Sequence, residues 1–247
     1  MDWLHLGIVF GAALITALAT GLGALPFLLV PRMSRRWLGA SNALAAGLMI
    51  AASLTLIVEG AQESQGRLAI GLLLGYLAMR VGRRFMHRHG EFALGELRGA
   101  DAKKALLIVG VMTLHSFTEG LGVGVSFGGG EGLGVFISAA IAVHNVPEGL
   151  AISLVLVPRG VSPWTAAGWS VFSSLPQPLM AVPAYLFVTA FTPLLPVGFG
   201  LAAGAMLWMT VSELLPEARV TLGRVGVLVA VIVSAVAMIA FQETLLR

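Results

Sequence analysis

The chain has 247 residues, of which 57% are hydrophobic and only 11% are charged. Soluble domains carry about 25% charged residues, so this composition excludes a soluble protein and indicates a bilayer around most of the chain. Cysteine is absent, which excludes disulfides and thiolate metal ligands. The net charge is +3, but the basic residues lie in segments between apolar runs, where they would set membrane topology, so the charge does not indicate nucleic-acid binding.

Eight apolar runs are long enough to cross about 30 Å of hydrocarbon as helices. We therefore expect an all-α integral membrane protein that forms a single polytopic domain over residues 1–247. In chain order, the predicted transmembrane helices are 4–30, 38–60, 66–86, 103–127, 132–157, 163–190, 192–216 and 222–245.

The distribution of basic residues predicts the orientation of these helices. If the N-terminus is outside, the inside connections 31–37, 80–104, 158–162 and 217–224 hold 13 of the 15 Lys and Arg, and only Arg67 and Arg247 fall outside. Inside loops are expected to carry this excess. We therefore predict that both termini lie outside and that residues 87–102 form a cytosolic loop.

The most informative polar residues form two copies of one motif, His-x-x-x-Glu-Gly-Leu, in the fourth and fifth runs. The first copy holds His115 and Glu119, and the second holds His144 and Glu148. Ionisable groups at membrane depth are costly and usually functional. Residues four apart share a helix face, so each His lies beside its Glu. If the two faces meet, four ligands converge on one point.

Two imidazoles and two carboxylates suit Zn²⁺ and neutralise its charge in an apolar setting. The same ligands leave Mn²⁺, Fe²⁺, Co²⁺, Ni²⁺ and Cd²⁺ open. A pair of structural His–Glu hydrogen bonds between the helices is the simpler alternative. We expect no cofactor beyond the transported metal.

Further polar or sulfur-bearing side chains can reach the same cavity. Ser116 and Asn145 each follow a motif histidine and can supply weaker oxygen ligands. Gln177 lies between two prolines in the sixth run, and Met49 lies in the second run, where a methionine is more often a core residue than a ligand.

Five residues are candidates for a transport path. Glu59 and Glu63, near the outer end of the second run, can attract cations or be ordinary loop charges. His87 and His89 can collect metal on the cytosolic side or belong to an ordinary solvated loop. Glu213, near the inner end of the seventh run, can serve the exit path or cap a helix.

These motifs resemble those of the ZIP family of divalent metal transporters (Zrt- and Irt-like proteins), in particular its bacterial and plastid branch. The resemblance covers nearly the whole chain, through ATGLGALP, AAGLMIAASL, HNVPEGLA, SSLPQPL and AAGAMLWMTVSELLPEA. It implies a ZIP-like bundle, commonly a homodimer, that moves metal toward the cytosol. It also implies an elevator-like movement of helices 1, 4, 5 and 6 against helices 2, 3, 7 and 8.

The resemblance also assigns ligand roles. His115, Glu119, His144 and Glu148 match the primary metal ligands, and Met49 falls where the family can place a thioether. Ser116 and Asn145 match secondary positions, but many relatives have Asn in place of Ser116, Pro in place of Thr118 and Glu in place of Gln177. Because a hydroxyl and an amide carry no charge, we predict one strong metal site and a second that is weak or absent.

Two other functions stay open at this point. An intramembrane zinc metallohydrolase would use the metal to activate water, although the chain lacks HExxH. A metal-binding membrane subunit would bind the ion without transporting it. We expect a secondary transporter and not an enzyme, because the phosphate-binding GxxxxGK[ST] motif is also absent. The expected location is a bacterial inner (plasma) membrane, with lipid, metal and a second copy of the chain as partners.

Overall fold

The computed structural model describes residues 3–30, 34–89 and 99–245, and these ranges hold helices and no strand. The prediction of an all-helical chain is therefore confirmed for the described residues. The elements are α1 (Trp3–Leu22), α2 (Pro26–Leu29), α3 (Arg35–Glu63), α4 (Gln65–His89), α5 (Gly99–Gly128), α6 (Glu131–Leu156), η1 (Val157–Arg159), α7 (Pro163–Ser174), α8 (Pro176–Ala190), η2 (Thr192–Leu194), α9 (Leu195–Met209), the π-helical turn η3 (Thr210–Leu214) and α10 (Leu215–Leu245).

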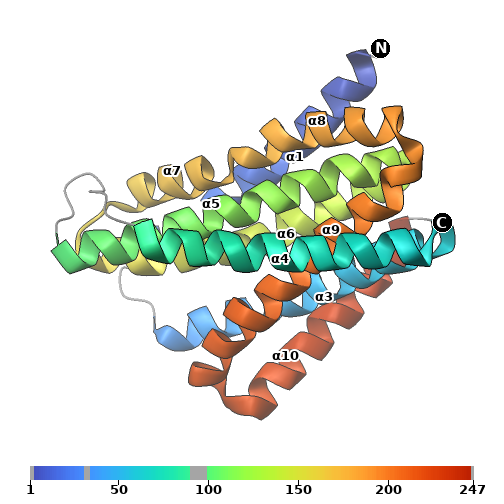
Figure 1. The fold of residues 1–247 in the computed structure, drawn as a ribbon. Helices are drawn as coiled ribbons and strands as arrows, with labels where there is room; N and C mark the ends of the chain where they lie inside the picture. The colour runs from blue at the N-terminus through green and yellow to red at the C-terminus, as the bar shows by residue number, and fades with distance from the viewer. Residues whose placement is uncertain (1–2, 31–33, 90–98, 246–247) are drawn as a thin grey trace.

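The long helices lie side by side, and successive ones run in opposite directions (Figure 1). Helices α5 and α6 occupy the middle of the bundle. On one side they pack against α1, α7 and α8, and on the other side α6 packs against α3 and α5 against α9. Helices α4 and α9 form one closely packed pair, and α3 and α10 form another. The paired motifs thus lie on the two helices that join both halves of the bundle.

Proline and glycine divide several of the predicted runs. The first run is two helices, α1 and α2, with a turn before Pro26. The sixth run is α7 and α8, which meet at Leu175, directly before Pro176. Proline lacks a backbone N–H, and its ring clashes with the carbonyl one turn earlier, so both breaks have a local cause although Leu25 and Leu175 keep helical dihedral angles. Between the last two runs, Gly223 adopts φ 70° and ψ 173°, a conformation that favours glycine.

The predicted loop 87–102 is helical at both ends. Helix α4 continues to His89 and α5 begins at Gly99. The two helices thus extend into the predicted loop at both of its ends. Residues 90–98, between the two helices, lie outside the described residues.

The outer surface of the bundle is strongly apolar. On α10, Val225, Leu228, Val229, Ile232 and Val233 are each more than half exposed. An exposed apolar surface this extensive indicates contact with lipid. By length and composition, five helical runs among the described residues can cross a membrane, namely Trp3–Leu29, Gly39–Glu63, Glu131–Arg159, Pro163–Ala190 and Thr192–Thr244.

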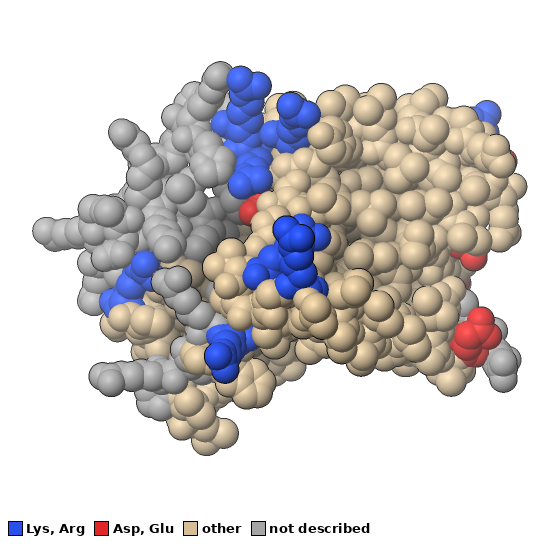
Figure 2. Space-filling model, turned by 90° about the horizontal axis from the view of Figure 1, so that it is seen from below, with Lys and Arg blue, Asp and Glu red and all other residues tan. Residues whose placement is uncertain are grey.

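Charged residues gather at the two ends of the bundle. Figure 2 shows most of the visible Lys and Arg side chains at one end and most of the visible Asp and Glu side chains at the other, with a broad uncharged band between them. This band is the part of the surface that suits hydrocarbon.

Candidate metal centre

Each motif pairs a buried glutamate with a glycine that lets a neighbouring helix come close. A Cβ atom on Gly120 would overlap the backbone of Gln177 in α8, and one on Gly149 would overlap the carbonyl oxygen of Thr20 in α1. Small residues at helix crossings permit this close approach. In each motif the glutamate side chain therefore points into the bundle, and the glycine after it lets α8 or α1 pack close to that glutamate.

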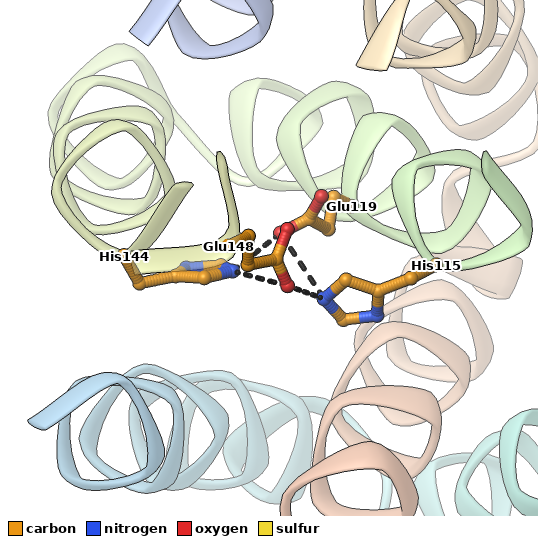
Figure 3. A group of neighbouring side chains, drawn as sticks. All are labelled: His115, Glu119, His144 and Glu148. Carbon is orange, nitrogen blue, oxygen red and sulfur yellow. Dashed lines mark ion pairs between the residues drawn. The ribbon is translucent and has the colours of Figure 1, made fainter. Parts of the chain in front are cut away.

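The four predicted ligands converge between α5 and α6 (Figure 3). His144 Nε2 lies 2.6 Å from Glu119 Oε1 and 3.6 Å from Glu148 Oε1. His115 Nε2 lies 2.9 Å from Glu148 Oε1 and 3.4 Å from Glu119 Oε1. All four side chains are buried, and one ligand atom from each lies within 4.8 Å of the others. Each carboxylate thus faces both imidazoles, across the helix interface as well as along its own helix.

The four facing atoms form ion pairs but lack well-oriented hydrogen bonds. His115 Nε2, His144 Nε2, Glu119 Oε1 and Glu148 Oε1 are buried, and none makes a hydrogen bond of acceptable geometry. Buried polar atoms almost always have a partner, so four such atoms at one point need an explanation. A divalent cation between them would satisfy all four at once.

A hydrogen-bonded layer lies behind Glu119. Gln177 Nε2 donates to Glu119 Oε2 at 2.6 Å, which leaves Glu119 Oε1 facing the imidazoles. The side-chain oxygen of Gln177, Oε1, accepts hydrogen bonds from Thr16 Oγ1 and, at 3.2 Å, from Asn145 Nδ2. Asn145 Nδ2 also donates to the backbone oxygen of Thr16 at 2.8 Å. Sequence reasoning missed Thr16, because a threonine in an apolar helix carries no signal by itself.

The two remaining candidates for ligand positions have different surroundings. The Ser116 hydroxyl is buried and has no hydrogen-bond partner. Met49 is fully buried in the main apolar core, where Thr210 Oγ1 lies 3.8 Å from its sulfur. Thr210 begins the π-helical turn η3 and also donates to the backbone oxygen of Met206.

The candidate path residues lie away from this centre or outside the described part. Glu63 is exposed and Glu59 half-buried near the C-terminal end of α3, where Glu59 lines a shallow pocket with Thr55 and Gln242. Glu213 Oε1 lies 3.1 Å from Arg83 Nη1, an ion pair that the sequence did not indicate. The side chains of His87 and His89 lie outside the described residues.

Comparison with known proteins shows the family of this chain. The profile described as "ZIP Zinc transporter" matches residues 85–225, a range that contains both motifs. The chain belongs to the ZIP family. The resemblance inferred from the motifs is confirmed, and so is the expectation that the chain is not an enzyme, because the matching family is one of transporters.

Three relatives show how far the ZIP likeness extends. The chain is 50% identical over 208 residues to an Arabidopsis thaliana protein provisionally named a zinc transporter, and the match covers 83% of the chain and 33% of that protein. It is 35% identical over 221 residues to the zinc transporter GufA of Myxococcus xanthus, covering 84% of the chain and 87% of GufA. It is 31% identical over 218 residues to the zinc transporter ZIPB of Bordetella bronchiseptica, covering 81% of the chain and 69% of ZIPB. The chain thus spans a third of the plant protein but most of GufA.

Proposed function

We propose that this chain carries a divalent metal cation, Zn²⁺ first among the candidates, across a membrane toward the cytosol. The main support for this proposal is the convergence of four buried ligand atoms that make no well-oriented hydrogen bond, one each from His115, Glu119, His144 and Glu148. The names of the relatives, all zinc transporters, support zinc as the cargo. Cd²⁺, Fe²⁺, Mn²⁺, Co²⁺ and Ni²⁺ suit the same ligands and belong in the test panel.

The proposed membrane arrangement has eight crossings with both termini outside. Beyond the five candidate runs, α4 and α5 would supply two more crossings. The run Thr192–Thr244 has 53 residues, which is about 80 Å of helix and more than twice the hydrocarbon thickness, so it would supply two. In this arrangement the basic end of the bundle faces the cytosol, as the positive-inside rule expects. We place the protein in a bacterial inner membrane because GufA and ZIPB are bacterial.

The centre is proposed to hold one ion tightly. The two carboxylates balance a divalent charge, and the imidazoles add neutral nitrogen ligands. The other carboxylate oxygen of Glu119, Oε2, already accepts a hydrogen bond from the Gln177 amide. Ser116, Asn145 and Gln177 would therefore orient the centre or bind a second ion only weakly. Met49 would contribute a thioether only if it approaches the ion during transport.

An elevator-like movement is supported by the way the helices group. All four ligands, and Thr16 and Gln177 behind them, lie on α1, α5, α6 and α8. Hydrogen bonds tie the centre across these helices, from Glu119 to Gln177 and from Asn145 to Thr16. The group can therefore move with its ion as one unit, while α3, α4, α9 and α10 form the proposed fixed part of a homodimer.

Metal uptake into liposomes tests the proposal. Purified protein is reconstituted, and uptake of each metal is followed with an internal indicator for the wild type, Glu148→Gln and Glu131→Gln. Glu131 is an exposed residue at the start of α6, so its change is the matched loss of one carboxylate outside the centre. We expect Zn²⁺ uptake by the wild type and Glu131→Gln, and a loss of at least tenfold in Glu148→Gln, about 1.4 kcal/mol or more.

The same preparation separates the alternatives. Metal binding without uptake would support a non-transporting subunit. Zinc-dependent hydrolysis of lipid or peptide without uptake would support a metallohydrolase. Equal uptake by Glu148→Gln and Glu131→Gln would refute the proposed centre even if the wild type transports.

A further inference from the structure

A second site lies at the basic end of the bundle, on the surface of α4 and α9. A pocket of about 440 Å³ is lined by Tyr76, Arg80, Arg83, Arg84 and Trp208. The pocket is open to the outside of the bundle along much of its length. None of these residues contributes to the metal centre, so the pocket needs an explanation of its own.

The three arginines leave excess positive charge in the pocket. Arg83 Nη1 lies 3.1 Å from Glu213 Oε1, and its guanidinium stacks 5.7 Å from the centre of the Trp208 ring. Arg80 Nη1 donates to the Tyr76 hydroxyl at 3.1 Å. Among the residues that the structure describes, Arg80 and Arg84 have no carboxylate within ion-pair distance. Three guanidinium groups thus line the described part of this pocket, which is suited to an anion.

Two of the arginines, Arg83 and Arg80, already have contacts that orient them before any ligand arrives. Trp208 is 8% exposed and forms the rigid wall under Arg83, while Tyr76 fixes one amino group of Arg80. A guanidinium held this way donates paired hydrogen bonds to phosphate oxygens with little further loss of side-chain freedom.

The neighbouring surface indicates where the anion comes from. Leu73 and Leu77, about two turns and one turn before Arg80 on α4, are 58% and 42% exposed, and Val211 on η3 is 63% exposed. The apolar surface therefore continues to the edge of the pocket. A soluble anion would need no such surface, whereas the acyl chains of a lipid would lie along it.

We propose that this pocket binds the phosphate headgroup of an anionic phospholipid from the cytosolic leaflet. Arg80 and Arg84 would bind the phosphate oxygens, Arg83 would supply the fixed charge behind them, and Leu73 and Leu77 would contact the acyl chains. The choice of the cytosolic leaflet rests on the proposed orientation, but the lipid site involves neither the metal ligands nor the ion and is tested separately from transport.

Lipid binding to the purified full chain tests the site. In detergent micelles, phosphatidylglycerol and phosphatidylcholine with identical acyl chains, and inorganic phosphate, are titrated while retention is measured by native mass spectrometry. The variants are Arg80→Gln with Arg84→Gln, Arg84→Gln alone, and a control pair, Arg219→Gln with Arg224→Gln. The control removes the same charge from exposed arginines of α10.

We expect the wild type to retain phosphatidylglycerol in preference to phosphatidylcholine. A hydrogen bond from each pocket arginine to the phosphate is worth about 1 kcal/mol net, so the pocket pair should weaken phosphatidylglycerol binding about thirtyfold and the single variant about fivefold. The control pair should stay within about twofold. Should the pocket pair fail to fold, the single variant decides, because the Arg84 side chain is exposed.

Three results would overturn the lipid site. The first is equal retention of the two lipids, and the second is equal weakening by the pocket and control pairs, which would indicate only general surface charge. The third is binding of inorganic phosphate as tight as that of phosphatidylglycerol, which would indicate a soluble ligand.

Discussion

Replacing Gln177 with glutamate should turn a one-ion centre into a two-ion centre. In the wild type, the Gln177 amide donates to Glu119 Oε2 at 2.6 Å. Gln177→Glu would put a carboxylate oxygen in place of that donor. The hydrogen bond to a charged acceptor, about 1.5–3 kcal/mol, would be lost. Two unit charges about 3 Å apart at an effective dielectric constant of about 20 repel by about 5 kcal/mol, unless a proton or a cation lies between them.

Ion counting with thermal unfolding measures this change. Wild type, Gln177→Glu and Gln62→Glu are saturated with Zn²⁺, separated from free metal and analysed for bound zinc per chain. Gln62 is exposed near the end of α3, so its variant adds the same charge away from the centre. We expect one zinc in the wild type and in Gln62→Glu, and two in Gln177→Glu.

The metal-free proteins give a second measurement. With chelator present, Gln177→Glu should unfold at a temperature about 10 °C below the wild type, because several kcal/mol of stability are lost. Two tightly held zinc ions in the wild type would refute the reasoning. So would one zinc in Gln177→Glu together with a wild-type response to chelator.

Three further predictions concern protons, the inner ion pair and helix packing. Apparent zinc affinity should fall as the pH falls, because binding must displace the protons that keep the empty, buried centre near neutrality. Titration calorimetry in buffers of different ionisation enthalpy should show this release of protons. A zinc affinity that is independent of pH would contradict the prediction. The partly exposed pair Arg83–Glu213 should contribute at most about 1 kcal/mol, so Glu213→Gln should keep uptake within about twofold, and a tenfold loss would instead assign Glu213 to the exit path. Gly149→Val should abolish folded protein on size-exclusion chromatography because its side chain meets the Thr20 carbonyl, whereas Gly7→Val, which has open space, should elute as the wild type does.

Sequence reasoning reached the helices and the four central side chains because their signals are local. Apolar runs of membrane length predict helices, and the spacing of His115 to Glu119 places both on one face. The repetition of the same spacing from His144 to Glu148 then predicts that two faces meet. The structure brings these four residues together.

Other features depend on contacts between distant segments. The bond from Thr16 to Gln177 joins residues 161 apart, and nothing near Thr16 distinguishes it from a packing residue. The pairing of Arg83 with Glu213 likewise depends on how α4 lies against α9 and η3. The turn between α1 and α2 was missed because the apolar sequence continues through it, although Pro26 marks its end.

X-ray absorption spectroscopy of the zinc-loaded protein tests the central claim most directly, since it reports the atoms bound to the ion. We predict a shell of nitrogen and oxygen only, at about 2.0–2.2 Å, with the outer-shell signal of two imidazoles that falls to one in His144→Ala. The absence of an imidazole signal in the wild type, or an imidazole signal unchanged in His144→Ala, would show that the ion is held elsewhere than between α5 and α6.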